Sequence, residues 1–510
     1  MTGSCHELLL GPADSVLIDC GLFQGAETSG TGATSASSEI DFSLASVRGL
    51  VITHTHIDHV GRIPYLLMAG FNGPIFCTSA TAHLLPLVIE DALKIGLTRD
   101  RDLIAGVLSR LRRMLIPFDY DEWQPLACDN SGHAVRVRFR QAGHILGSAY
   151  VEFEWGDAGG ALRAPGGVRG VAAVGGDRGV GAVGGVGAVG GVGAVGGVGA
   201  VGGVGAVAAD QPLKVSSLYP LAEGYRVVFS GDLGCRNTPL LPDRQPLERA
   251  DLLFLESTYG DRLHESRQDR SVRLKTVIER CVSDGGAVLI PAFSIGRTQE
   301  LLYEIEDLIA SNAGFWPTIT VILDSPMAAE FTALYQQLAH LWDQEALQRR
   351  AAGHNPLDFS RLHTVASHAD HEHIVNFLRT SGEPCIVIAA SGMCAGGRMV
   401  NYLKALLPDP RTDVLFVGYQ ASGTPGRAIQ EYGPDGGYVE LDDERITIRA
   451  GIHTLGGYSA HADQAELIDF VLAASPPVGE VRLIHGDSGA RRALATKLQE
   501  RAALTFHSPT

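Results

Sequence analysis

The sequence contains no apolar run of about 18 residues without glycine, which is the length that a membrane-spanning helix needs. No basic region precedes its first apolar stretch, so the N-terminal segment does not have the pattern of a signal peptide. None of its eight cysteines forms a C-x-x-C pair, which excludes the usual zinc-finger and redox motifs. These absences predict a cytoplasmic chain, not anchored in a membrane, whose cysteines are reduced and structural.

Positive charge is also scarce, since the net charge of the 510 residues is −16. Proteins that coat nucleic acids are usually basic, so this balance argues against that class. An acidic enzyme can still act on RNA if metal ions and a few arginines make its cleft locally cationic. The length and the 45% of hydrophobic residues predict a globular chain with at least two cores, whose oligomeric state the sequence does not reveal.

Residues 159–209 differ from the rest of the chain because they consist almost entirely of valine, glycine and alanine, with a recurring G-A-V-G-G-V-G unit. Such a composition offers few side chains for a specific core, and glycine makes ordering costly. We expect a flexible, low-complexity insertion at the tip of a hairpin between strands at 150–155 and 225–230. An elastin-like or β-solenoid repeat with a binding role is the alternative.

Elsewhere, short strands rich in Val, Ile and Leu alternate with amphipathic helices, which predicts an α/β fold. The clearest strands are expected at 50–53, 288–291, 319–323, 385–389 and 414–417. The clearest helices are expected at 297–310 and 371–380. The central block therefore has the pattern of a separate α/β unit.

The strongest chemical signal is the segment T-H-T-H-I-D-H-V-G-R, which follows the first of these strands and contains His54, His56, Asp58 and His59. Imidazole nitrogens and carboxylate oxygens are good zinc ligands. Because side chains alternate along a strand, His54 and His56 lie on the same side of its end. A turn then lets Asp58 and His59 face the position of a second metal ion. Three of the 18 histidines fall within the six residues 54–59, so a chance histidine-rich loop is a poor explanation.

Three further candidate ligands follow other predicted strands or precede one. His144 lies in G-H-I-L-G-S, Asp232 in F-S-G-D-L-G, and His485 in L-I-H-G-D. Each motif alone is a weak signal. A lone histidine, for example, more often makes structural hydrogen bonds than binds a metal. Together they lie at strand ends, where the active sites of α/β proteins gather.

The order of these motifs resembles the metallo-β-lactamase superfamily, including Leu17-Ile-Asp19-Cys-Gly. The resemblance implies a four-layer αββα sandwich with two Zn²⁺ ions and a hydroxide between them. It assigns His54, His56 and His144 to one zinc and Asp58, His59 and His485 to the other. It makes Asp232 the bridging ligand, gives Asp58 and Asp232 catalytic roles, and places Asp19 behind a ligand histidine, which it orients.

The flanks of the central block resemble the β-CASP nucleases, a branch of that superfamily that includes an endonuclease of pre-mRNA 3′-end processing. Leu255-Glu256-Ser-Thr-Tyr-Gly260 matches an acidic motif, and Tyr458-Ser-Ala-His461-Ala-Asp463 matches a histidine motif. The resemblance implies a zinc-dependent endoribonuclease, with RNA favoured by the histidine at position 485. It also implies a metallo-β-lactamase domain at 1–257 and 437–510, interrupted by a β-CASP domain at 258–436.

The chemistry of phosphodiester cleavage suggests a role for His461. The 3′-oxygen of ribose is a poor leaving group unless it is protonated, and a histidine titrates near working pH. We expect His461 to act as the general acid and Glu256 to orient it. A histidine that only packs or supports the metal ligands is the alternative.

Three glycine-rich turns of the central block carry arginine, whose planar guanidinium group can donate two hydrogen bonds to a phosphate. We expect five residues in or beside these turns to bind the substrate: Arg297, Ser391, Arg398, Gln420 and Arg427. Ordinary turns with surface arginines are the alternative, because a glycine-rich turn alone is a weak signal.

Two other functions stay open at this point. A small-molecule hydrolase of the same fold, such as a thioesterase, would not need the large central block or the pair of Glu256 and His461. An RNA-binding protein that has lost catalysis would not be expected to keep a full set of ligands. The sequence does not indicate which RNA is cut.

Overall fold

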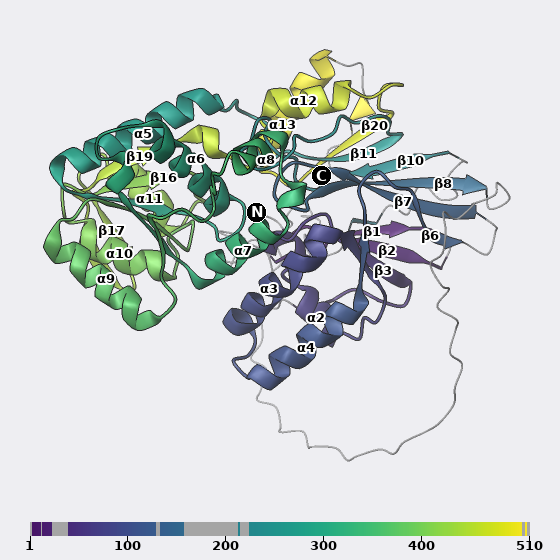
Figure 1. The fold of residues 1–510 in the computed structure, drawn as a ribbon. Coiled ribbons are helices and arrows are strands. Elements are labelled where there is room, and N and C mark those ends of the chain that lie inside the picture. The colour runs from purple at the N-terminus through teal and green to yellow at the C-terminus, as the bar shows by residue number, and fades with distance from the viewer. Residues whose placement is uncertain are drawn as a thin grey trace, which may run out of the picture.

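The computed structural model describes residues 3–11, 13–22, 39–128, 133–157, 213–214, 224–501 and 505–506. The predicted insertion at 159–209 lies outside the described residues. Figure 1 shows two sheets facing each other, with helices on their outer faces, and an α/β unit beside them. Within the described part of the chain, no helix is both long and apolar enough to cross a bilayer.

The first sheet of the sandwich has the strand order β5-β4-β3-β2-β1-β9. Its strands are β1 (His6–Leu9), β2 (Ser15–Ile18), β3 (Val47–Val51), β4 (Ile75–Thr78), β5 (Leu115–Phe118) and β9 (Leu213–Lys214). Its helices are α1 (Ile57–Val60), α2 (Ile63–Met68), α3 (Ser79–Gly96) and α4 (Arg101–Met114). Buried apolar side chains of this sheet pack between it and these helices, as one face of a layered α/β fold requires.

The second sheet has the order β21-β20-β11-β10-β8-β7-β6. Its strands are β6 (Gln124–Cys128), β7 (His133–Gln141), β8 (Ala149–Asp157), β10 (Arg226–Phe229), β11 (Leu252–Glu256), β20 (Glu480–Ile484) and β21 (Thr505–Phe506). Helices α12 (Gln464–Leu472) and α13 (Ser488–Arg501) cover its outer face (Figure 1). Strands β8 and β10 pair antiparallel with Phe229 opposite Val151, as predicted, but the connection between them is not a simple hairpin, because β9 pairs with β1 in the first sheet.

Alternate residues of both sheets fill the space between them. The cluster includes Val16 and Val51 from the first sheet and Phe153, Phe229 and Phe254 from the second. The rings of Phe229 and Phe254 stack 4.5 Å apart. This core holds the two sheets together below the loops that carry the site.

The inserted unit is built on an all-parallel sheet of order β14-β13-β15-β12-β16-β19. Its strands are β12 (Ala287–Pro291), β13 (Thr320–Asp324), β14 (Leu362–Thr364), β15 (Cys385–Ala389), β16 (Asp413–Phe416) and β19 (Gly451–Thr454). Its helices are α5 (Arg267–Asp284), α6 (Arg297–Ser311), α7 (Pro326–Gln337), α8 (Gln344–Ala351), α9 (His368–Ser381), α10 (Arg398–Leu406) and α11 (Pro425–Tyr432). The predicted strands and helices of this block are confirmed to within a few residues.

The end of the inserted unit differs from the prediction. Strand β19 pairs with β16, and the hairpin of β17 (Tyr438–Leu441) and β18 (Glu444–Thr447) contributes side chains to the core of the inserted unit. The predicted boundary at 436 is therefore too early, and the unit extends through Thr454. The sequence offered no marker there, because the strand pairing that decides it joins segments far apart in the chain.

Candidate metal centre and active site

The histidine-rich segment follows β3, as predicted, and continues into α1. His54 and His56 belong to the extended segment after β3, and Asp58 and His59 lie in the single turn of α1. The change from strand to helix turns the chain, so the two pairs of side chains point to different places. All except His56 are buried, which removes water as a competing partner.

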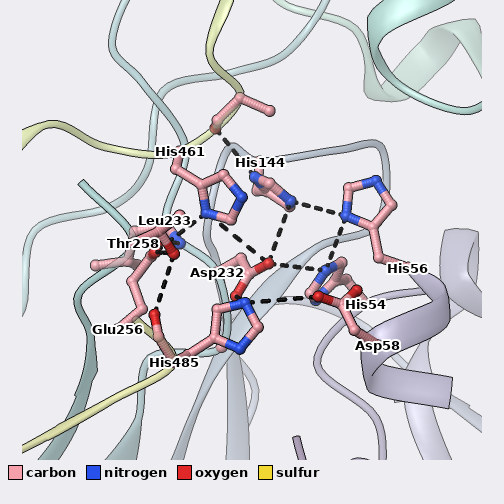
Figure 2. Close-up of polar contacts among 12 residues, drawn as sticks. His54, His56, Asp58, His144, Asp232, Leu233, Glu256, Thr258, His461 and His485 are labelled. Carbon is pink, nitrogen blue, oxygen red and sulfur yellow. Dashed lines mark hydrogen bonds and ion pairs between the residues drawn. The ribbon is translucent and has the colours of Figure 1, made fainter. Parts of the chain in front are cut away.

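Asp232 lies between two groups of candidate ligands, at the centre of Figure 2. Its Oδ2 is 3.4 Å from His54 Nε2 and 3.5 Å from His144 Nε2. Its Oδ1 is 3.2 Å from His59 Nε2 and 3.6 Å from His485 Nε2. Each carboxylate oxygen therefore faces a different set of nitrogens.

The first group is completed by His56, whose Nδ1 is 3.2 Å from His54 Nε2 and 2.9 Å from His144 Nε2. The second group is completed by Asp58, whose Oδ2 is 3.6 Å from His485 Nε2. Within each group, the candidate ligand atoms lie within 4.8 Å of one another. The structure thus brings together all seven residues that the sequence analysis predicted as ligands.

Groups behind the ligands hold the imidazole rings in place. Asp19 Oδ2 accepts a hydrogen bond from His59 Nδ1 at 2.7 Å, and the backbone N–H and hydroxyl of Thr53 also donate to Asp19. The Nδ1 of His144 donates to the carbonyl of Ala460 at 3.0 Å. Because Nδ1 of each ring is engaged, Nε2 is the atom presented to Asp232.

The electrostatics suit a cation. Burial lowers the pKa of His54 to about 3 and that of His56 to about 4, so both are neutral donors. Burial opposes charge on His59 as well, but the carboxylates of Asp232 and Asp19 raise its pKa well above the ordinary value. Burial would raise the pKa of Asp232, yet the surrounding histidines lower it well below its usual range, so this residue is a carboxylate.

Three buried atoms of the centre make no hydrogen bond within the described part of the chain: His59 Nε2, Asp232 Oδ1 and His485 Nε2. A buried polar atom without a partner is costly, and native proteins rarely leave several in one place. All three are typical ligand atoms for zinc. The donor set therefore fits divalent metal ions.

A third cluster adjoins the centre on the side of the inserted unit. His461 Nδ1 donates to Glu256 Oε2 at 3.0 Å, and Glu256 also accepts from Leu233 N–H and from the Thr258 hydroxyl (Figure 2). Burial disfavours charge on His461, but Glu256 and Asp232 outweigh it and raise its pKa to about 9. With its oxygens engaged in this way, Glu256 suits the orientation of His461 better than metal binding.

Three family models match the chain in sequence order. Residues 7–160 match the metallo-β-lactamase superfamily, residues 298–429 the Beta-Casp domain, and residues 445–509 the Zn-dependent metallo-hydrolase RNA specificity domain. The chain is 33% identical to a ribonuclease of Thermus thermophilus over 98% of its own length and 94% of that protein.

The chain belongs to the β-CASP branch of the metallo-β-lactamase superfamily. It is also 27% identical to the transcription termination factor FttA of Methanosarcina mazei, over its whole length and 70% of that factor. The corresponding factor of Methanothermobacter thermautotrophicus is 28% identical over 98% of this chain and 67% of its own length.

The five predicted substrate residues of the β-CASP domain have different surroundings. Arg297 is 6% exposed and pairs with Glu300, so its guanidinium faces the protein interior. Arg398 donates to buried Asp324 at 2.6 Å, and Gln420 is buried and donates to the Gly392 carbonyl at 2.8 Å. Ser391 is half-buried, and Arg427 alone among the predicted arginines is exposed.

Two supporting groups were not predicted. Thr53, which bonds to both Asp19 and His54 Nδ1, lies inside the quoted motif, so its position before the first ligand was an available signal. The carbonyl of Ala460 carried no such signal, because a backbone oxygen has no residue type to recognise. It is brought to His144 by the return of the chain from the β-CASP domain.

Proposed function

We propose that this β-CASP protein is a zinc-dependent endoribonuclease whose active site holds two zinc ions. The observation that carries the proposal is the position of Asp232, whose two oxygens face two separate groups of ligand atoms. A carboxylate that bridges two metal ions is suited to this arrangement, and paired metals are suited to displacement at phosphorus.

His54 Nε2, His56 Nδ1, His144 Nε2 and Asp232 Oδ2 would hold the first ion. Asp58, His59 Nε2, His485 Nε2 and Asp232 Oδ1 would hold the second. When bound, zinc supplies a Lewis acid that makes water more acidic and stabilises negative charge on phosphate oxygens. Asp19, Thr53 and Ala460 keep the rings in the orientation that this binding needs.

RNA is the proposed substrate because both the family models and the named relatives point to it. The family model described as an RNA specificity domain spans both His461 and His485. The relative of similar length is named a ribonuclease, and the archaeal relatives are named transcription termination factors.

His461 is proposed to donate a proton to the departing 3′-oxygen of ribose. Its Nδ1–H is engaged by Glu256, which stabilises the charged ring and leaves the Nε2 proton for transfer. The ring lies against that of His144, with centroids 4.6 Å apart, so it is next to the first metal group. His461 is therefore close enough to reach a phosphodiester held at that group.

The proposal is tested by metal analysis together with RNA cleavage. We expect close to two equivalents of zinc after dialysis, and internal cleavage of 5′-labelled unstructured RNA that a chelator abolishes and added zinc restores. Products that map to internal positions would distinguish an endonuclease from an exonuclease. Less than one equivalent of metal, together with cleavage insensitive to the chelator, would contradict the proposal.

A further inference from the structure

Two aromatic side chains are exposed at one edge of the β-CASP sheet. Phe293 follows β12 and is 40% exposed, and Tyr419 follows β16 and is 41% exposed. Strands β12 and β16 are parallel neighbours, so their carboxyl ends lie side by side. Other aromatic side chains, such as Phe377, are equally exposed, but Phe293 and Tyr419 follow the carboxyl ends of parallel strands, where α/β proteins bind ligands.

The two residues flank one glycine turn. The ring of Phe293 lies against Gly392, where an added Cβ would be 3.0 Å from its Cδ2 atom. The carbonyl of the same glycine accepts the hydrogen bond of Gln420, the neighbour of Tyr419. Contacts through Gly392 and Gln420 therefore connect the segments that carry Phe293 and Tyr419.

This edge adjoins the candidate active site on both sides. An added Cβ at Gly296, in the turn that begins with Phe293, would be 2.7 Å from the side chain of Ile145, the residue after His144. On the other side, Tyr259 has its ring 6.1 Å from that of His461. Burial raises the pKa of Tyr259, and the phenol of Tyr419 contributes to the rise.

We propose that Phe293 and Tyr419 each stack against a base of single-stranded RNA next to the phosphodiester to be cut. The inference rests on the proposed ribonuclease function and adds two residues that contact the substrate bases. Aromatic faces stack on any base, so the contact selects unpaired strands and not a particular sequence. Bases of a duplex are already stacked and paired, and their faces are closed to these rings.

The test compares leucine variants, which keep apolar bulk but remove the aromatic face. Phe293→Leu and Tyr419→Leu are each expected to raise KM for unstructured RNA about 5- to 140-fold, the range for loss of one base stack. Tyr419→Phe, which keeps the ring, is expected to retain the wild-type KM. The matched control is Phe377→Leu, because Phe377 is 44% exposed on α9, at the far end of the β-CASP domain (Figure 1).

RNA with one abasic nucleotide identifies the contact. The abasic nucleotide is placed at successive positions of the strand. In the wild type, it is expected to raise KM when it occupies a stacked position. In each leucine variant, it is expected to leave KM unchanged at the position that the missing ring contacted. Unchanged KM in folded, metal-replete Phe293→Leu and Tyr419→Leu would overturn the inference, as would an equal effect in Phe377→Leu.

A binding measurement separates this inference from the proposed function. Fluorescence anisotropy with labelled single-stranded RNA and a chelator reports affinity without cleavage. Binding that weakens in the two leucine variants, in a protein that never cleaves RNA, would support the stacking and contradict the nuclease. Cleavage by the wild type with equal binding by all variants would contradict the stacking alone. A wild type that neither binds nor cleaves RNA would overturn both.

Discussion

At the scale of single residues, the roles of His461 and the metal ligands can be separated by substitution. His461→Ala is expected to keep both metal ions and RNA affinity but to lose about 10²–10⁴-fold in rate, the usual share of a general acid. RNA with a 3′-bridging phosphorothiolate has a better leaving group and should restore much of the lost rate. Loss of zinc in this variant, or no relative rescue, would show that His461 supports the metal centre instead.

Metal affinity separates the proposed ligands from the groups that orient them. His56→Ala is expected to remove metal and activity together, because it deletes a ligand of the first group. Asp19→Asn should keep the ligands but loosen His59, and we expect metal affinity to fall about 10- to 100-fold. Competition with a chromogenic chelator measures both. Equal affinity in wild type and Asp19→Asn would mean that this hydrogen bond does not tune the metal.

At the scale of secondary-structure elements, two predicted substrate arginines have opposite environments. Arg427, at the start of α11, is exposed, and Arg427→Ala is expected to weaken RNA binding and reduce the salt slope of affinity by about one. Its control is Arg379→Ala, an exposed arginine on α9. Wild-type affinity and slope in Arg427→Ala would place the substrate path elsewhere.

Arg398, at the start of α10, is expected to contribute to stability. It donates to Asp324, a fully buried carboxylate that also accepts from His371 and from the Tyr402 hydroxyl. Arg398→Ala should lower the free energy of unfolding by about 1–3 kcal/mol, because one donor to a buried charge is lost and two remain. Urea denaturation measures this change. An unchanged midpoint with weakened RNA binding would instead favour the predicted substrate contact.

At the scale of the whole molecule, the sandwich closes without residues 159–209. Strands β8 and β10, which flank that segment, pair directly over four residues, with Arg226 opposite Glu154 at one end. Loop-closure entropy changes only logarithmically with loop length, so shortening the connection costs little. Deletion of 159–209 is expected to leave the melting temperature and the nuclease rate nearly unchanged. A folded deletion variant with much lower activity would show that the segment has a role.

Much of this protein was determined by local sequence. Ligands that follow one another on a strand end and a turn, such as His54 to His59, are placed by backbone geometry within a few residues. Apolar runs such as residues 385–389 likewise indicate buried strands, because a parallel sheet covered on both faces excludes polar side chains. The four candidate ligands of this loop and the main α/β elements could therefore be recognised from local sequence, whereas His144, Asp232 and His485 were weak signals one by one.

Other features were decided only by the tertiary structure, because they depend on segments distant in the chain. The separate orientation of the two Asp232 oxygens depends on histidines from three segments, and the boundary after Thr454 depends on the pairing of β16 with β19. The same holds for Arg297, whose guanidinium is buried by its surroundings, and for the aromatic pair beside Gly392. Composition and spacing show which side chains the chain contains, whereas packing decides which of them are exposed to solvent.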